Sequence, residues 1–149
     1  MSDKKTVNII NRKANFNYHT EIKFVAGIVL TGSEVKSIRS GNVNISDAYC
    51  LFNDEVLVIK NMHVTEFKQA SHYNHVPLRD RILLLNKKEL NKIHKLLGNK
   101  GTAVFPLKLF EADRKLLKLE IGVGKGKKSF DKREDIKAKD IQREIARLK

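Results

Sequence analysis

Two segments in the second half of the chain place apolar residues at every second position, and this alternation constrains the fold more than any other feature. A period of two is the pattern of a β-strand that buries one face. Between the segments, Asp113-Arg114 supplies a turn. We therefore predict a hairpin of Thr102–Phe110 and Leu117–Val123, each strand burying one set of side chains: Ala103, Phe105, Leu107 and Leu109, then Leu117, Leu119, Ile121 and Val123.

Shorter segments rich in β-branched and apolar residues predict further strands. Asn53-Asp54 joins two of them as a hairpin turn, because both side chains tolerate the left-handed region. The polar stretch 11–19 is predicted as a turn or short helix, and 63–78 as a long loop. The predicted strands are Val7–Ile10, Ile22–Leu30, Asn44–Phe52, Glu55–Asn61, which is apolar on both faces, and Arg81–Leu85.

Two capping signatures predict short helices between these strands. Thr31 is followed three residues later by Glu34, which is a capping box, and the helix then runs from about Ser33 to Ser40 and stops at Gly41. The second signature is Asn86-Lys87-Lys88-Glu89. It precedes apolar residues at helical spacing and glycines that end the helix: Leu90, Ile93 and Leu97, then Gly98 or Gly101.

Six or so short strands with two helices between them indicate a mainly β fold. A closed six-stranded barrel of the oligonucleotide-binding type, with short embedded helices, is the first choice, because closure removes the exposed edges of the sheet. Periodicity alone leaves a β-sandwich open as well.

The composition changes after residue 123. The segment 124–149 contains ten Lys and Arg residues and five Asp and Glu residues. Its apolar residues form only a narrow helical stripe, and an isolated helix of this length is marginal in water. We therefore predict a domain over 1–123 and a basic tail over 124–149, disordered alone and helical when bound, with the stripe Ala138, Ile141, Ile145 and Leu148.

The charge balance indicates the kind of partner. Thirty Lys and Arg residues oppose 17 Asp and Glu residues, giving a net charge of +13. Nucleic acid is the expected partner, because no segment combines a basic face with large aromatic residues as a membrane-surface helix does. No apolar run could span a bilayer, and the single cysteine, Cys50, excludes an intrachain disulfide. A cytoplasmic protein is expected.

The sequence lacks the usual catalytic motifs, including a phosphate-binding loop and His-Glu-x-x-His. Gly122-x-Gly124-x-Gly126 is interpreted as a flexible hinge. His72-x-x-His75, with His63 or Cys50, could be imagined as a metal site or a metal-dependent nuclease centre, but the carboxylate cluster of two-metal chemistry is missing. We expect no cofactor, no metal and no enzymatic activity.

Several blocks of the chain resemble the small protein B family, the SsrA-binding proteins, which partner transfer-messenger RNA (tmRNA) in bacteria. The resemblance runs nearly end to end. Its most specific parts are the Gly-x-Glu-Val-Lys-Ser block and the basic block of the tail. The matching blocks are Asn11-Arg12-Lys13-Ala14, 26–39, 41–45, Pro77-Leu78-Arg79, 81–85 and 126–133.

The resemblance implies a protein that binds the tRNA-like domain of tmRNA with an oligonucleotide-binding-type barrel. It implies that the tail becomes helical in the empty mRNA channel of a stalled ribosome, near the small-subunit decoding centre. The outcome is trans-translation: the ribosome is rescued and the incomplete peptide is tagged for proteolysis. Elongation factor Tu would be engaged indirectly through the RNA. We expect a monomer with no membrane partner. A ribosomal protein or initiation-type factor with the same barrel is the alternative.

The candidate site residues come from the resemblance and from local chemistry. Asn86 is also an ideal N-cap, and Leu84 could equally be a core residue. Val25 stands where the family often has an acidic residue, and it is left out of the site. The RNA-binding candidates are Lys36, Arg39, Leu84, Asn86, Gly126, Lys127 and Lys128; the ribosome-binding candidates in the tail are Phe130, suited to stacking on a base, Asp131, Lys132, Arg133, Ile141, Ile145 and Leu148.

Overall fold

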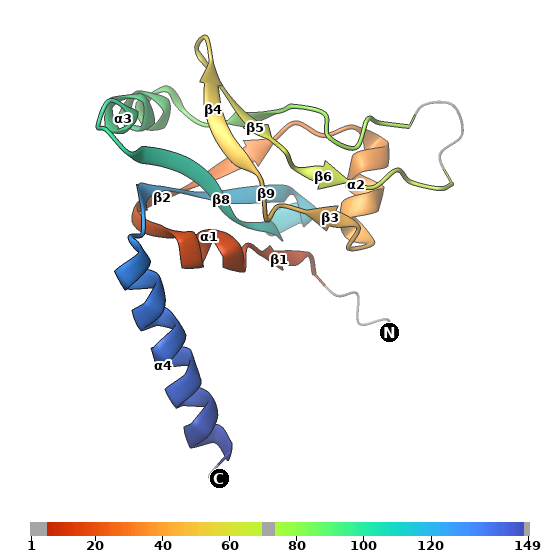
Figure 1. Cartoon of the computed structure of the whole chain (residues 1–149). Helices are drawn as coiled ribbons and strands as arrows, with labels where there is room; N and C mark the ends of the chain where they lie inside the picture. Colours follow the sequence, from red (N-terminus) through yellow and green to blue (C-terminus); the bar gives the residue numbers. More distant parts are fainter. Residues whose placement is uncertain (1–5, 70–73, 148–149) are drawn as a thin grey trace.

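The computed structural model describes residues 6–69 and 74–147 (Figure 1). Within them the chain forms nine strands, four α-helices and one 3-10 turn. In chain order these are β1 Asn8–Ile10, α1 Arg12–Asn17, β2 Tyr18–Ile28, α2 Gly32–Arg39, β3 Val43–Asn44, β4 Tyr49–Asn53, β5 Val56–Lys60, β6 His63–Val64, β7 Arg81–Leu84, α3 Lys87–Leu97, β8 Thr102–Glu111, the 3-10 turn Asp113–Lys115, β9 Leu117–Gly126 and α4 Ser129–Arg147.

The strands form one large antiparallel sheet and a small ribbon. The large sheet has the order β1-β8-β4-β5-β7-β2-β9, and β9 pairs also with β8. The pairing therefore passes through six strands and returns to β8, with β1 attached outside this ring. Strands β3 and β6 make the separate two-stranded ribbon. The prediction of a mainly β fold with a few helices is confirmed.

The core lies inside the ring of strands. Leu57 and Ile59 of β5 are fully buried there, and Val58, on the other face of the same strand, is also buried. That face of β5 is covered only in part, because Val56 on the same face is 40% exposed. The helices contribute one fully buried isoleucine each, Ile38 from α2 and Ile93 from α3. Cys50 lies in the same cluster, and burial raises the pKa of its thiol.

Both predicted capping boxes are present. The Thr31 hydroxyl accepts a hydrogen bond from the Glu34 backbone N–H, and a Glu34 carboxylate oxygen accepts one from the Thr31 N–H at 2.8 Å. Asn86 and Glu89 make the same reciprocal pair at the start of α3. Helix α2 ends at Arg39, Ser40 is its C-cap residue, and Gly41 follows with φ of +81°. This left-handed conformation is the reason for a glycine there.

A β-bulge in β8 overturns one prediction. The pairing with β9 shifts register between Pro106 and Lys108, so Leu107 is an extra residue. Proline has no N–H for the ladder, and an extra residue reverses which face the following side chains occupy. Phe105 and Leu107 pack against α1, whereas Leu109 joins the main core. The prediction that Leu109 shares their face was wrong.

Helix α1 is held under this bulge by Asn11. The buried amide of Asn11 donates to the carbonyl oxygens of Ile45 at 3.0 Å and Pro106 at 2.8 Å, and its Oδ1 accepts from the Ala14 N–H. One side chain thus caps α1 and ties it to β8. Directly after the helix, Tyr18 stacks on Phe105, with ring centroids 4.3 Å apart.

Strand β9 continues beyond the domain boundary that we placed after residue 123. It runs to Gly126 and pairs with the start of β2 over this stretch. A Cβ added to Gly124 would lie 1.8 Å from the His19 carbonyl oxygen. Gly124 therefore permits a close approach of two backbones, which differs from the flexible hinge that the sequence suggested.

Candidate nucleic-acid interface

The end of β7 and the start of α3 present Leu84 and Asn86 to solvent. Leu84 is 57% exposed, whereas its neighbour Leu83 is buried. The structure thus excludes the core position that was the alternative for Leu84. The Asn86 side chain caps α3 through Oδ1, which accepts from the Glu89 N–H at 2.8 Å. In the described residues its amide nitrogen makes no hydrogen bond, so it can donate to a ligand.

Leu84 belongs to an exposed apolar strip on the outer face of β2 and β7. Val25 and Ile82, the other two members, are 50% and 43% exposed. Gly27 of β2 pairs with Leu84, and a Cβ at Gly27 would lie 3.2 Å from the Leu84 Cβ. Exposed aliphatic side chains beside polar groups offer a surface against which a base turned out of its stack can pack. Val25 pairs with Glu120 of β9, so a carboxylate lies across the strand from it.

A buried charge cluster positions β7. Glu34 and Arg81 are both fully buried and form an ion pair. The Arg81 guanidinium also donates to the Met62 carbonyl oxygen at 2.6 Å, and Arg79 reaches the other Glu34 oxygen at 2.6 Å. These contacts fix the strand whose alternate residues are the exposed Ile82 and Leu84. The sequence indicated only the capping role of Glu34; the blocks containing Arg79 and Arg81 were noted without a role.

The cluster keeps Glu34 ionised. Burial alone would raise the pKa of Glu34, but hydrogen bonds from Arg79, from the Thr31 N–H and from Arg81 outweigh it and lower the pKa from 4.5 to about 2. Burial conversely lowers the pKa of the Arg81 guanidinium, and the contact with Glu34 opposes that effect. The carboxylate and both cations therefore depend on one another.

The two candidates on α2 lie apart from this surface. Helix α2 and helix α3 lie on opposite sides of the ring in Figure 1. Arg39 forms an ion pair with Glu111 and donates to the Lys115 carbonyl oxygen at 2.7 Å, so its charge is already engaged. The Lys36 ammonium is exposed and lies 5.5 Å from the centre of the Phe67 ring. The structure does not bring these cations together with Leu84 and Asn86.

The tail leaves the rest of the chain, here called the body, at the end of β9, and specific contacts attach it there. The Lys127 N–H donates to the Asn17 carbonyl oxygen at 2.8 Å, and the Lys127 ammonium pairs with Asp135 of α4. The Lys127 side chain is only 12% exposed. This lysine therefore joins the tail to the body instead of offering a free charge to phosphate.

Helix α4 also rests on Phe16 of α1. The ammonium groups of Lys132 and Lys139 each lie 5.9 Å from the centre of the Phe16 ring. Sequence reasoning missed this contact, because nothing local links Phe16 to residues more than one hundred positions away. Further along, Ile141 and Ile145 are 57% and 53% exposed. They form an apolar stripe that the body leaves uncovered.

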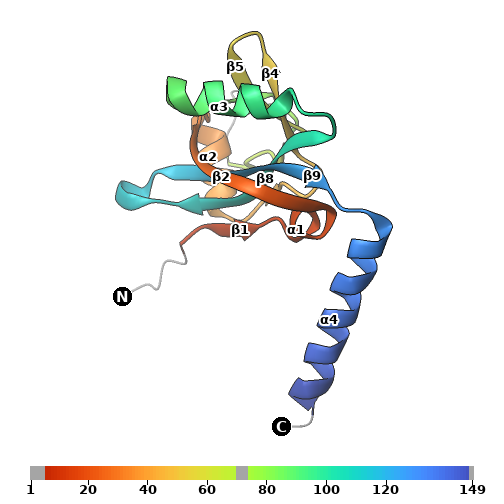
Figure 2. The same cartoon turned by 90° about the vertical axis from the view of Figure 1, so that its left-hand side faces the viewer.

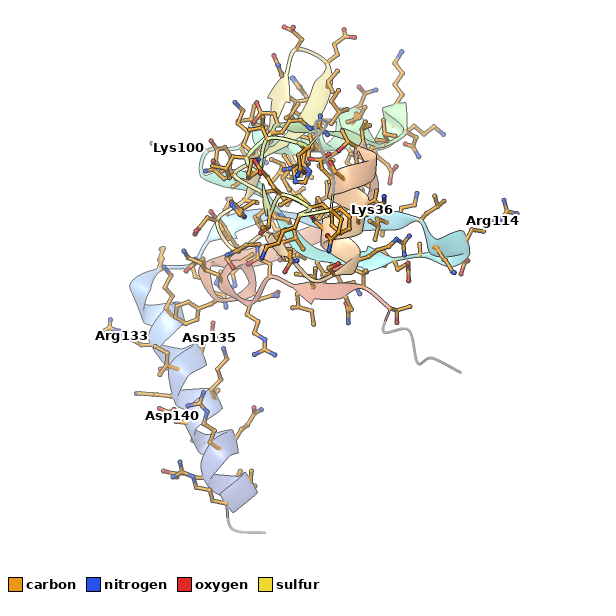
Figure 3. The ribbon with its side chains drawn as sticks, turned by 90° about the vertical axis from the view of Figure 1, so that its right-hand side faces the viewer. Lys36, Lys100, Arg114, Arg133, Asp135 and Asp140 are labelled. Atoms are coloured by element: carbon orange, nitrogen blue, oxygen red, sulfur yellow. The ribbon has the colours of Figure 1, made fainter. Side chains whose placement is uncertain are left out.

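The remaining tail candidates lie along the same helix. Figure 3 shows Arg133, Asp135 and Asp140 spaced along α4, which points away from the body. Gly126 ends β9, and Lys128 is exposed just before the helix. The backbone of Phe130 and Asp131 is in α4, but their side chains and the whole of Leu148 lie outside the described residues.

The loop histidines give little support to a metal or nuclease centre. His75 is buried, and both ring nitrogens are engaged, Nδ1 with the Ser33 hydroxyl at 2.9 Å and Nε2 with the Val64 carbonyl oxygen at 2.8 Å. His72 lies outside the described residues. Among the residues that are described, no group of three or more His, Cys, Asp or Glu side chains could hold a metal ion. None of the helices described is long and apolar enough to cross a bilayer.

Comparison with known proteins gives consistent matches over almost the whole chain. The chain is 48% identical over 145 residues to an SsrA-binding protein of Christiangramia forsetii, covering 97% of this chain and 92% of that protein. It is 47% identical over 137 residues to the SsrA-binding protein of Bacillus subtilis, covering 92% and 87%.

A solved structure described as "tmRNA-SmpB: a journey to the center of the bacterial ribosome" has a chain that is 33% identical. It matches with a TM-score of 0.70 and covers 87% of this chain and 94% of that one. The family model described as SmpB protein matches residues 8–149. On the strength of this near full-length match and of the relatives above, the chain belongs to the SmpB family.

Proposed function

We propose that this chain binds the tRNA-like domain of tmRNA and delivers it to stalled ribosomes for trans-translation. The observation that carries the proposal is the likeness, over 87% of the chain, to the structure described as "tmRNA-SmpB: a journey to the center of the bacterial ribosome". The relatives are named SsrA-binding proteins, which supports the same RNA. The protein acts as a binding partner and not as an enzyme, in the cytoplasm and as a monomer. Elongation factor Tu meets it only through the RNA.

The body binds the RNA. The ring of six strands forms an oligonucleotide-binding-type barrel, and its contact surface includes Leu84, Asn86 and the apolar strip beside them. Apolar side chains support exposed bases, and the free amide donors of Asn86 can hydrogen-bond to a base or phosphate. The net charge of +13 supplies a salt-dependent attraction to the RNA backbone.

The tail supplies the contact with the ribosome. Helix α4 enters the empty mRNA channel near the small-subunit decoding centre, where Phe130, Asp131, Lys132 and Arg133 contact ribosomal RNA. Ile141 and Ile145 are exposed in the described structure, and burying them would make the helix more stable when bound than alone.

This division of labour can be tested by truncation after Lys128, which removes α4 and keeps β9 intact. We expect the truncated protein to retain its preference for tmRNA over bulk tRNA at physiological salt, and to lose ribosome rescue in a reconstituted translation assay. A full-length variant with Ile141→Ala and Ile145→Ala keeps the tail charge, so loss of rescue in this variant would assign the contact to the apolar stripe. Loss of RNA affinity on truncation would contradict the separate roles.

The alternative function, a ribosomal protein or initiation-type factor, would be favoured by equal, weak binding to both RNAs and by co-sedimentation with unstalled ribosomes. A nuclease with His75 as ligand or base is disfavoured by the two hydrogen bonds that already engage this ring. The nuclease hypothesis predicts divalent-dependent RNA cleavage that is lost on His72→Ala or His75→Ala.

A further inference from the structure

A hollow of about 550 Å³ lies between the tip of the β4–β5 hairpin and helix α3. Figure 2 shows α3 lying across this hairpin, at the end of the molecule away from α4. The volume falls within the range of roughly 300–1,000 Å³ that is usual for small-ligand sites. The side chains that give the hollow its chemistry are Phe52, Asp54, Glu55, Lys87, Asn91 and His94.

One wall of the hollow is aromatic. Phe52 of β4 and His94 of α3 meet edge to face, with ring centroids 5.2 Å apart and an angle of 66° between the rings. Phe52 is half-buried and His94 is exposed. Two aromatic rings that line an open hollow provide a surface on which a planar ligand can stack, and histidine and phenylalanine serve this purpose in RNA-binding proteins.

The polar groups that line the hollow select the kind of planar ligand. Asp54 and Glu55 bring two carboxylates to the tip of the hairpin, and Asn91 brings an amide. Carboxylates accept hydrogen bonds from the exocyclic amino group of cytosine, and an asparagine amide matches the edge of adenine. The same carboxylates repel a free phosphate or an acidic peptide. The hollow therefore favours a base that carries an amino group.

Cations run beside the hollow on the adjacent face of α3. Lys87, Asn91 and His94 are spaced i, i+4 and i+7, which places them in one row facing the hollow. Lysines one position further on repeat this spacing and form a second row, about 10 Å long: Lys88, Lys92 and Lys95.

The lysine ammonium groups of this second row are free to contact a phosphate. All three lysines are exposed, and in the described part of the chain none forms an ion pair. Glu89, the only acidic residue of α3, is committed to the capping box. Such cations neutralise phosphates and release their counterions.

We propose that the hollow binds one unpaired, amino-bearing base of an RNA strand, whose phosphates follow Lys88, Lys92 and Lys95. The inference rests on the proposed function for the class of ligand and adds a base-reading site to it. A base inserted here stacks on one of the two rings, Phe52 or His94, meets the other at its edge, and directs its amino group to Asp54 or Glu55. The adjoining phosphates then lie along the row of lysines.

The test uses the full chain and three single-stranded RNA trinucleotides, CCC, AAA and UUU, followed by ¹H–¹⁵N NMR. We expect the amide signals of Glu55, Asn91 and His94 to shift with CCC and AAA and to shift much less with UUU, which lacks the amino group. His94→Ala should weaken CCC binding about tenfold, as expected for loss of one stacking ring. His94→Phe should keep most of the affinity.

The lysine row has its own matched pair of variants. Lys92→Ala should weaken binding and reduce its salt dependence, while Lys68→Ala, an exposed loop lysine with the same loss of charge, should not. Shifts spread over all basic surfaces, or an unchanged affinity in His94→Ala, would overturn the site.

Binding of the same protein to tmRNA and to bulk tRNA separates the two ideas. If the protein prefers tmRNA but shows no localised shifts with the trinucleotides, only the base site is refuted. If it shows no preference for tmRNA over bulk tRNA, the proposed function is refuted.

Discussion

Replacing Glu34 by Gln tests how much the buried charge cluster contributes to folding. The substitution keeps the size and one acceptor oxygen of the side chain but removes its charge. Arg81, which is fully buried, then loses its counter-charge, and Arg79 loses its partner at 2.6 Å. Removing one member of a buried pair is far more costly than never having had the pair, because the remaining charge stays uncompensated.

Two lines of reasoning give a similar loss of folding stability for Glu34→Gln. The pKa of Glu34 lies at about 2 compared with an ordinary value of 4.5. Each pKa unit corresponds to about 1.4 kcal/mol, so the ionised carboxylate stabilises the folded state by about 3 kcal/mol. Breaking comparable buried pairs in other proteins costs about 3–5 kcal/mol. We therefore expect Glu34→Gln to lower the free energy of unfolding by about 3 kcal/mol.

Urea unfolding followed by circular dichroism measures this loss, with Glu66→Gln as the control. Glu66 is exposed, so the same chemical change there should alter the stability by less than about 0.5 kcal/mol. If the two variants lost equal stability, or Glu34→Gln lost less than about 1 kcal/mol, the reasoning about the cluster would be refuted.

The pH dependence provides a second check on the same residue. The folded-state pKa is lower than the unfolded one, so the stabilisation is complete above about pH 4.5 and is lost as the pH falls towards 2. The difference in stability between the natural protein and Glu34→Gln should therefore shrink steadily over this range. A difference that stayed constant from pH 6 to pH 3 would show that ionisation of Glu34 is not its source.

Three further substitutions follow from individual contacts. Leu84→Ala should weaken tmRNA binding with a stability loss under about 1 kcal/mol, whereas Leu83→Ala, its buried neighbour, should cost about 2–5 kcal/mol in urea unfolding. Phe16→Ala removes the ring beneath two lysines of α4, so ¹⁵N relaxation should report faster motion of this helix; unchanged relaxation would mean that the ring does not hold it. Gly124→Ala should destabilise the protein by about 1–3 kcal/mol, because the added Cβ would collide with the His19 carbonyl oxygen. An unchanged free energy of unfolding would show that β2 can move aside.

The features that could be predicted from the sequence are those whose causes lie within a few residues. Each capping box spans four positions, and both were found where the motif predicted them. The turn between β4 and β5 was predicted at Asn53-Asp54, and Asp54 has the expected positive φ of 57°. These contacts need no knowledge of distant segments, because the side chain and the backbone group that it satisfies are neighbours in the chain.

The features that were missed depend on pairing between distant segments. The bulge that redirects Leu109 becomes visible only when β8 is aligned with β9. The burial of Arg81 depends on α2 meeting β7, and charged residues are ordinarily expected at the surface. The exposure of Leu84 was equally hard to predict, because a leucine in a strand is more often buried. For Lys127 and Arg39 the residue type predicted a free cation, but each has a partner that the sequence does not reveal.

The double pairing of β9 has a mechanical consequence. This strand is hydrogen-bonded to β2 on one side and to β8 on the other along nearly its whole length, and the tail is its direct continuation. A force that pulls on α4 is therefore loaded onto two antiparallel ladders in shear, so many hydrogen bonds share it at once. The hydrogen bond from Lys127 to Asn17 and the ion pair of Lys127 with Asp135, where the tail leaves β9, would break before these ladders do. The tail can thus carry load while the sheet around the core keeps its shape.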